Sequence, residues 1–177
     1  MAKSKSLKEL ILKSNKIGDE GMVVIAEALN GFTSHVELIN LSQTNISCES
    51  FRALLLHLRN NSRMKTLIVD KNNLHSVMPF SAIKDTISQQ SSKMEVLSCA
   101  HCNLSDSFGL AFAEGLKRNR FLKRVNFYGN EMTCRSLSNL AAALRDSTNS
   151  LVHLNLGKNN LKDKGGVVFA DALRFNR

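Results

Sequence analysis

The chain has 177 residues, 43% of them hydrophobic, and a formal net charge of +9. This length and composition fit one soluble domain with a sizeable core, and no apolar run approaches the ~20 residues of a membrane-spanning helix. The first residues lack the apolar stretch of a secretory leader, so we expect a cytoplasmic protein. The excess of Lys and Arg favours an acidic partner: a protein, a nucleic acid or a lipid headgroup.

One pattern recurs six times along the chain. Counting from the first residue of each unit as offset 0, apolar residues stand at offsets 0, 3, 5 and 10, and Asn, Thr or Cys stands at offset 8. Successive units start 28 to 30 residues apart, which is the signature of a repeat architecture. The units start at Leu7, Val36, Met64, Met94, Leu122 and Leu151.

Each unit is predicted to begin with a short strand and to continue with a helix. Around offsets 3 to 5, apolar and variable residues alternate with the period of two that is typical of a strand. The second half has helical spacing, and residues 17–29 are closely matched by residues 161–173. The expected inward helix positions are Ile25, Ala26, Leu29, Leu54, Leu55, Leu58, Phe112, Ala113, Leu116, Leu140, Ala141, Leu144, Phe169, Ala170 and Leu173, with Ile83 and Ile87 in the third unit, which an insertion shifts.

Short polar side chains stand where the helices are expected to begin, and each can accept a hydrogen bond from a free backbone N–H group. These capping residues are Asp19, Ser47, Asp106, Thr133 and Asp163. Strand, turn and helix repeated at this period predict an α/β solenoid, a horseshoe with parallel strands on the concave face and helices on the convex face. We expect it to form a single domain of six repeats over residues 1–177.

The register of these residues, Leu-x-x-Leu-x-Leu-x-x-Asn-x-Leu in its full form, resembles the ribonuclease-inhibitor-type class of leucine-rich repeats. The resemblance covers the chain from Leu7 to Leu173. Members of the family include ribonuclease inhibitor, the repeats of NOD-like receptors, the Ran GTPase-activating protein and tropomodulin-like actin cappers. The resemblance implies a module that binds a protein partner, and it implies that the Asn, Thr and Cys residues at offset 8 form a hydrogen-bonded structural ladder.

We therefore expect a non-enzymatic interaction scaffold or sensor that binds a protein partner, with an acidic partner favoured, on its concave face. One alternative is a GTPase-activating protein of the Ran-activator type, for which Asn40, Asn126 and Asn155 at offset 4 are the only indication. The other is a charge-driven binder of nucleic acid or acidic surfaces. Nucleic acid is the less favoured partner, because Tyr128 is the only tyrosine and the chain has no tryptophan for base stacking.

Side chains at offsets 2, 4, 6 and 7 are expected to line the concave surface. Apolar residues at these offsets in the first four units predict an exposed apolar strip, and exposed apolar patches mark binding surfaces. The last two units carry charged and aromatic residues of the kinds found at binding hot spots. The partner-binding residues that we predict are Leu38, Ile68, Arg124, Tyr128, His153 and Lys158.

Two other motifs have a structural explanation. Cys99-Ala-His-Cys102 has residue types that suit zinc or redox chemistry, but its cysteines occupy offsets 5 and 8 and no second pair completes four ligands. The basic run from Lys117 to Arg124 is interpreted as a helix end and a solvated connection, with a basic binding patch as the alternative. We find no catalytic motif and expect no cofactor or metal.

The two ends of the array lack the polar capping units that solenoids normally need. Residues 173–177 are similar in kind to residues 116–120, which are followed at once by the next strand. We therefore expect either that the chain is a fragment of a longer array or that its uncapped repeat ends self-associate end to end with another copy.

Overall fold

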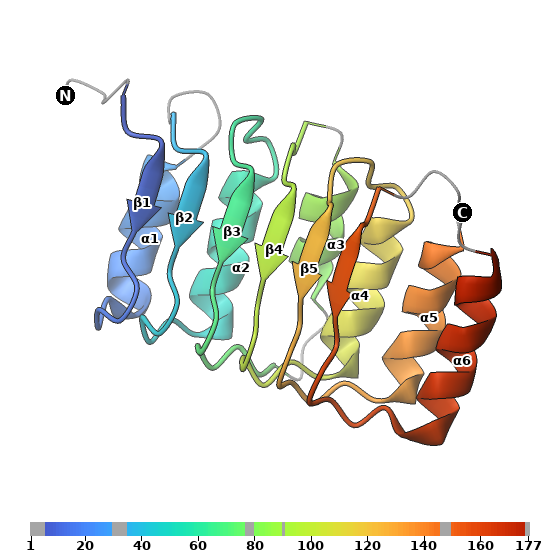
Figure 1. Ribbon diagram of the computed structural model, residues 1–177. Coiled ribbons are helices and arrows are strands. Elements are labelled where there is room, and N and C mark those ends of the chain that lie inside the picture. Colours follow the sequence, from blue (N-terminus) through green and yellow to red (C-terminus); the bar gives the residue numbers. More distant parts are fainter. Residues whose placement is uncertain (1–5, 30–34, 77–79, 90, 146–149, 176–177) are drawn as a thin grey trace.

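The computed structural model describes residues 6–29, 35–76, 80–89, 91–145 and 150–175. Strands and helices alternate along it, with the strands in one layer and the helices in a second layer behind them (Figure 1). The strands are β1 (Glu9–Ile11), β2 (Leu38–Asn40), β3 (Thr66–Ile68), β4 (Val96–Ser98), β5 (Arg124–Asn126) and β6 (His153–Asn155). The helices are α1 (Gly18–Ala28), α2 (Cys48–Leu58), α3 (Ser81–Ser88), α4 (Asp106–Leu116), α5 (Cys134–Leu144) and α6 (Lys162–Phe175).

The strands form one parallel sheet in chain order. Each strand pairs with the next in the same register, so that residues of equal offset lie side by side; Leu10, for example, pairs with Ile39, and Ile39 with Leu67. Because a helix is about 10 Å wide and a strand about 4.8 Å, the helix layer spreads more than the sheet and the stack curves. This is the predicted α/β solenoid, with the strands on its concave face.

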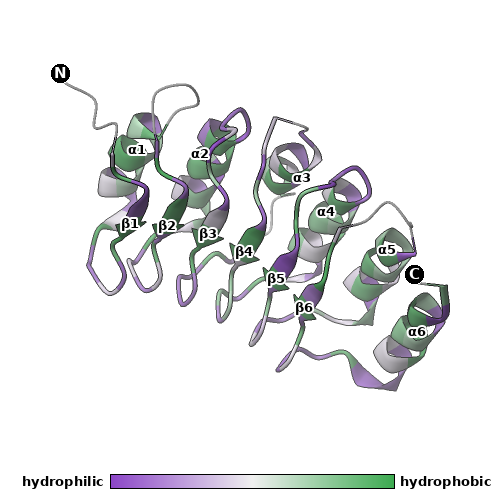
Figure 2. Ribbon diagram, turned by 45° about the horizontal axis from the view of Figure 1, so that its top comes forward, coloured by the Kyte–Doolittle hydropathy of each residue, from purple (hydrophilic) through white to green (hydrophobic). Residues whose placement is uncertain are grey.

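The core lies between the two layers. In Figure 2, green, hydrophobic residues recur in the helices behind the strands. Its centre is aromatic: Phe127 of the fifth unit contacts Phe108 and Phe112 of α4 edge to face, with ring centroids 5.4 Å and 4.9 Å apart. Such contacts between neighbouring units stabilise a solenoid, because each unit alone cannot bury its apolar face.

The predicted inward helix positions are confirmed in the four middle units, including Ile83 and Ile87 of the shifted third unit, all of which are buried. The prediction is wrong for Ala170 and Leu173 in the last helix, which are exposed, Leu173 to 64%. The physical reason is that no described helix packs against the outer side of α6. The same open environment leaves Phe169 only partly buried.

Two of the predicted helix caps are confirmed. The side chain of Ser47 accepts a hydrogen bond from Glu49 N at 3.2 Å, and that of Thr133 accepts one from Arg135 N at 3.2 Å. Both residues have an extended backbone directly before their helices, which is the conformation of an N-terminal cap.

The prediction that Asp19 and Asp106 cap their own helices is wrong. Both lie within the first turn of their helices and bind the start of the next one: Asp19 Oδ1 accepts from Ser47 N at 2.8 Å and Ser50 Oγ at 2.6 Å. Asp106 accepts from Thr133 N at 2.8 Å and Thr133 Oγ1 at 2.6 Å. These carboxylates therefore join successive units. Asp163 occupies the same position in α6. It is exposed, and no described backbone N–H group donates a hydrogen bond to its carboxylate.

The residues at offset 8 form the expected ladder. The carboxamide of Asn72 donates to Leu41 O and Val69 O, both at 2.8 Å, and accepts from Thr44 N and Ile46 N at 3.0 Å and 3.2 Å. Asn130 and Asn159 likewise donate to carbonyls of their own and the preceding unit. Thr44 has a shorter side chain, and its hydroxyl donates to Leu41 O in its own unit.

The longest described helix, α6, has 14 residues. Among the described residues, no helix has both the length and the apolar character needed to cross a bilayer.

Candidate protein-binding face

The outer side of the sheet presents two parallel rows of side chains, because strand residues alternate between its two faces. The offset-2 row contains Glu9, Leu38, Thr66, Val96, Arg124 and His153, and the offset-4 row contains Ile11, Asn40, Ile68, Ser98, Asn126 and Asn155. Within the first four units, apolar and polar residues alternate along both rows.

This register changes the interpretation of Leu38 and Ile68. Leu38 pairs with Thr66, while Ile68 pairs with Asn40 and Ser98, so the two apolar side chains lie in different rows. Both are half-buried. The apolar side chains of the first four units therefore alternate between the two rows, diagonal to one another, and polar residues are their direct partners.

In the last units the predicted residues do come together. Arg124 and His153 are direct partners on β5 and β6, and both are exposed. Lys158 Nζ lies over the ring of Tyr128, 5.8 Å from its centroid. On its other side, Tyr128 contacts the ring of His101 edge to face, with centroids 5.3 Å apart. We call His101, Tyr128 and Lys158 the aromatic ridge.

Two glycines that sequence reasoning missed make room for the aromatic ridge. A Cβ on Gly157 would lie 2.7 Å from Tyr128 Cδ2, and one on Gly129 would lie 2.5 Å from His101 Nδ1. Gly129 also has a φ of +69°, a backbone conformation that favours glycine. The signal in the sequence is that each is the only glycine at its offset, 7 for Gly129 and 6 for Gly157.

The turn after each strand has a common geometry. At offset 7 every unit places a residue in the left-handed region, with φ between 51° and 69°: Ser14, Gln43, Lys71, His101, Gly129 and Lys158. Two members of the aromatic ridge, His101 and Lys158, thus lie on a fixed turn at the end of their strands.

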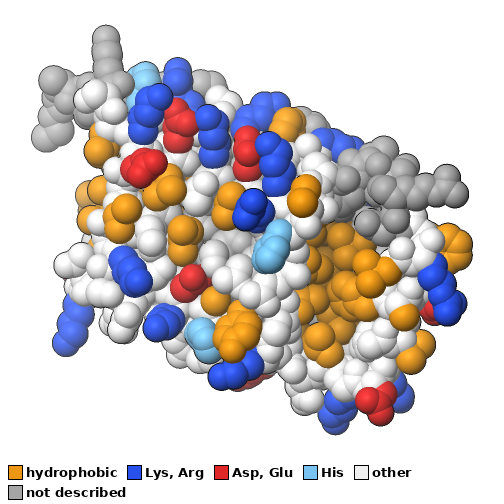
Figure 3. Space-filling model, viewed as in Figure 1, with side chains coloured by type: hydrophobic (Ala, Val, Ile, Leu, Met, Phe, Trp, Pro, Cys, Tyr) orange, Lys and Arg blue, Asp and Glu red, His pale blue; other side chains and the backbone are white. Residues whose placement is uncertain are grey.

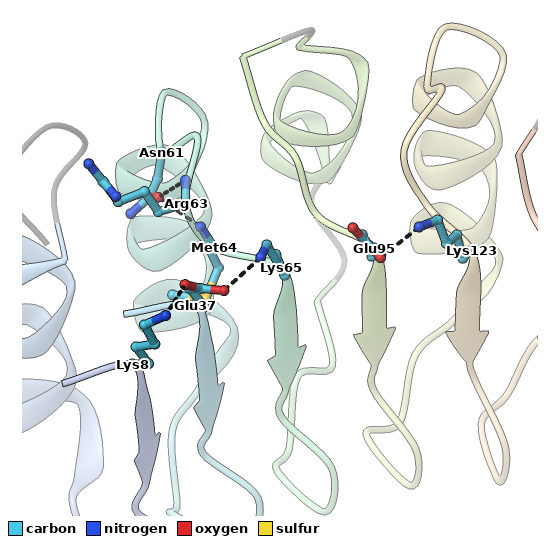
Figure 4. A network of polar contacts seen from close by, with 8 residues as sticks. All are labelled: Lys8, Glu37, Asn61, Arg63, Met64, Lys65, Glu95 and Lys123. Carbon is cyan, nitrogen blue, oxygen red and sulfur yellow. Dashed lines mark hydrogen bonds and ion pairs between the residues drawn. The ribbon is translucent and has the colours of Figure 1, made fainter. Parts of the chain in front are cut away.

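A row of alternating charge precedes the strands at offset 1 (Figure 4). Glu37 pairs with Lys65 at 2.7 Å and with Lys8 at 3.5 Å, and Glu95 pairs with Lys123 at 2.8 Å. The hydrogen bond and charge of Lys65 lower the pKa of Glu37. Sequence reasoning missed these pairs, which neutralise Lys65 and Lys123. Arg124 and Lys158 are exposed basic residues outside this row.

The side chains of Asn40, Asn126 and Asn155 are engaged by the backbone. The Oδ1 atom of each accepts a hydrogen bond from the backbone N–H two residues later, Ser42, Tyr128 and Gly157 respectively, at 3.0 to 3.2 Å. These asparagines therefore shape the turn, and they give no separate support to the Ran-activator alternative.

The cysteines of the Cys99–Cys102 motif lie in the core. Cys99 is fully buried, and burial raises the pKa of its thiol well above the ordinary value; burial raises the pKa of Cys102 to about 12. Cys102 Sγ donates to Val69 O at 3.3 Å, while His101 is exposed on the aromatic ridge. Among the described residues, no three His, Cys, Asp or Glu side chains cluster as a metal site would require.

The basic run divides among several roles. Arg120 donates from Nη1 to Lys117 O and Asn119 O at the end of α4, at 3.1 Å and 2.9 Å. Lys123 pairs with Glu95. The run lies between the end of α4 at Leu116 and the start of β5 at Arg124. This position agrees with the interpretation of a helix end followed by a connection.

Comparisons with known proteins agree with this geometry. A family model described as "Leucine Rich repeat" matches residues 3–26 and 148–170. The chain is 27% identical to NACHT, LRR and PYD domains-containing protein 13 of Homo sapiens and 24% identical to the ribonuclease inhibitor of Mus musculus, over 84% and 95% of its own length. It spans only 14% and 43% of those two relatives.

Two solved structures share the fold. The tropomodulin C-terminal domain of Caenorhabditis elegans is similar with a TM-score of 0.62 and 18% identity, covering 80% of this chain and 84% of that one. Leiomodin-1 Actin-Binding Site 2 is similar with a TM-score of 0.57 and 17% identity, covering 98% and 83%. The chain thus has the fold of a leucine-rich repeat solenoid. The matched family model and relatives support a repeat of the ribonuclease-inhibitor type, and with it a protein-interaction module.

Proposed function

We propose that the chain binds an acidic segment of a protein partner on the concave face of its last three units. The observation that carries the proposal is the aromatic ridge beside exposed Arg124 and His153. Tyr and Arg are the residue types that dominate binding hot spots. The proposed contacts are Arg124, Tyr128, His153 and Lys158 at the centre, with Leu38 and Ile68 as apolar contacts toward the first units.

The ridge is suited to this role because Tyr128 already packs against its neighbours. Tyr128 is held between His101 and Lys158 and rests on Gly157. A side chain that is fixed before binding loses little conformational entropy when the partner arrives. Arg124 and Lys158, which form no ion pair with a described carboxylate, would attract and orient an acidic partner.

We also propose that the protein acts in the cytoplasm and without catalysis of its own. All four cysteines are free, and Cys48, Cys99 and Cys102 are buried as thiols, as expected in a reducing compartment. The similarity to the mouse ribonuclease inhibitor supports a role as a binder, because the name of that relative describes the inhibition of another protein.

The test is affinity capture from nuclease-treated cell extract, quantified by mass spectrometry. Arg124→Glu and Tyr128→Ala should each reduce capture of the specific partner by at least about tenfold, the loss of a hot-spot contact. The matched controls are Arg135→Glu and Leu56→Ala, at exposed positions on α5 and α2, and both should leave capture unchanged.

Each other outcome has a clear meaning. Unchanged capture by both Arg124→Glu and Tyr128→Ala would show that this face is not the binding site. Capture that disappears when the extract is nuclease-treated would favour the charge-driven nucleic-acid alternative. Circular dichroism of each variant checks that the fold is intact.

A further inference from the structure

The outer side of the last unit is an exposed apolar surface. Between β6 and α6 lies a groove of about 480 Å³, lined mainly by Leu144, Leu151, Leu154, Leu161, Phe169 and Leu173. Figure 3 shows it as a continuous hydrophobic patch at the right of the view. Val152 and Leu173 are exposed to 83% and 64%. We call this surface the end face.

The end face has the composition of an internal junction between units. Leu122, Val125 and Phe127 of the fifth unit occupy the offsets of Leu151, Leu154 and Leu156, and all three are fully buried by the sixth unit. The corresponding residues of the sixth unit are only partly buried. What covers these positions inside the array is the strand and helix of the next unit.

The hydrogen-bonding edge of β6 also has the pattern of an internal junction. Phe127 N donates to Asn155 O at 2.9 Å, and Gly129 N donates to Gly157 O at 2.8 Å. The equivalent donors of the sixth unit are Leu156 N and Lys158 N, for which the described part of the chain provides no backbone acceptor. An added parallel strand would accept from both.

Asp163 specifies the kind of helix that fits. Asp19 and Asp106, at the same offset, bind the next helix through a hydroxyl-bearing residue at its start and through the serine three positions later: Ser47 and Ser50 for Asp19, Thr133 and Ser136 for Asp106. Asp163 is exposed and so is available for the same contacts.

We propose that the end face docks one further strand-plus-helix unit of the same repeat, contributed by the polypeptide that follows α6, with Ser or Thr at the start of its helix and Ser three residues later. Asp163 caps that helix from the preceding unit. The proposal concerns a different surface from the concave face and does not depend on the proposed function.

The sequence favours this occupant over a second copy of the chain. If another copy docked through its first unit, the two hydroxyl positions would be filled by Gly18 and Gly21, which have no side chain for Asp163 to bind. Gly18 has a φ of +70°, and the residue before it, Ile17, provides no side-chain cap. The second-copy arrangement therefore lacks the contact that marks the junctions after Asp19 and Asp106.

A second sequence signal points in the same direction. Asn61 and Asn119, three residues after Leu58 and Leu116, turn the chain from a helix toward the next strand: Asn119 Oδ1 accepts from Phe121 N and Leu122 N at 2.8 Å and 2.7 Å. Asn61 makes the equivalent bonds to Arg63 N and Met64 N. Asn176 stands three residues after Leu173 in the sequence, although it lies outside the described residues.

The test adds a unit of known sequence. Residues 30–62, which hold Ser47 and Ser50, are fused after Leu173, the position that aligns with Leu29. Hydrogen exchange of the Leu156 and Lys158 amides, followed by NMR, should slow by at least about tenfold when the unit docks. Asp163→Ala should reverse much of this slowing in the fused chain and change nothing in the chain of residues 1–177. Ser47→Ala with Ser50→Ala in the added copy is the matched control and should act like Asp163→Ala.

Unchanged exchange at Leu156 and Lys158 would overturn the proposal, and an Asp163→Ala effect of equal size in both chains would overturn the role of Asp163. Two measurements remain decisive if the fused chain does not fold. The transcript should encode Ser or Thr 27 or 28 residues after Asp163, the separations of the two internal pairs; a stop codon before that point would overturn the proposal. Concentration-dependent oligomers that Leu173→Asp abolishes in sedimentation velocity would instead identify a second copy as the occupant.

Discussion

The ring of Tyr128 rests on the backbone of Gly157, so closely that a Cβ there would lie 2.7 Å from Tyr128 Cδ2. The Tyr128 ring of the fifth unit thus occupies space that any side chain larger than that of Gly157 would fill in the sixth unit. Since Tyr128 is the only tyrosine and there is no tryptophan, its near-ultraviolet signal reports this contact directly.

We predict that Gly157→Ala displaces the Tyr128 ring. The near-ultraviolet circular dichroism should change, and partner capture should fall as it does for Tyr128→Ala, while the free energy of unfolding changes by less than about 1 kcal/mol because Gly157 is exposed. Gly166→Ala is the control: a Cβ there meets no atom within 4 Å, so a helical alanine should stabilise the chain by about 0.5–1 kcal/mol. An unaltered Tyr128 signal in Gly157→Ala would contradict this account of the ridge.

Asn72→Ala should destabilise the chain by about 2–4 kcal/mol, since it leaves the buried Thr44 N and Ile46 N without their acceptor. Urea denaturation measures the change. Asn73→Ala, at the neighbouring exposed position, should cost no more than about 0.5 kcal/mol. Equal effects of the two variants would show that the ladder contributes no special stability.

Asp106→Ala should lower the free energy of unfolding by about 1–2 kcal/mol at neutral pH, the typical value of a lost helix cap. Burial raises the pKa of Asp106, but hydrogen bonds from Ser136 and Thr133 outweigh it, so the pKa lies below the ordinary 3.8. A lowered folded-state pKa gives stability that is present above 3.8 and is lost as the pH falls through the folded-state value.

The difference between the wild-type chain and Asp106→Ala should therefore shrink on acidification to about pH 2. Asp163→Ala is the matched control, because this exposed carboxylate caps no described helix, and it should have little effect at either pH. A constant difference across the pH range would rule out the carboxylate as the source of the stability.

Cys99 and Cys102 should resist thiol reagents in the folded chain. Only the thiolate reacts, and burial keeps the pKa of both thiols high, about 12 for Cys102. Half-exposed Cys134 should be modified first. Mass spectrometry after timed labelling, with a urea-unfolded sample for comparison, measures the order. Rapid labelling of Cys99 or Cys102 would reopen the metal or redox interpretation of this motif.

The strands and the helices could be predicted because each depends on a pattern that recurs at a fixed spacing, and the offset-8 ladder because the resemblance to the repeat family implies it. The roles of Asp19 and Asp106 could not, because an acidic residue at a helix start reads as a cap of its own helix, whereas its partners lie 27 or 28 residues away. Leu38 and Ile68 were expected in one strip because both were assigned to the concave surface. Only the pairing of the strands shows that they lie in different rows of that surface.

The exposure of Leu173 and the packing of Tyr128 on Gly157 were missed for a related reason. Leu173 has the sequence environment of buried Leu144 and Leu116, and only the neighbouring unit distinguishes them. The sequence of one repeat predicts its strand and its helix, while burial and site geometry are properties of pairs of repeats.

The ladder also sets the order in which the array comes apart. Asn72, Asn130 and Asn159 each bind the preceding unit through the side chain, whereas Thr44 offers the first unit only its backbone carbonyl, to Ile17 N and Gly18 N. The first unit is held by the side chains of Asp19 and Asn61 and by no asparagine of the ladder. The junction between the fourth and fifth units, where Asn130 and Asp106 both bind across, should therefore open later than the amino-terminal junction.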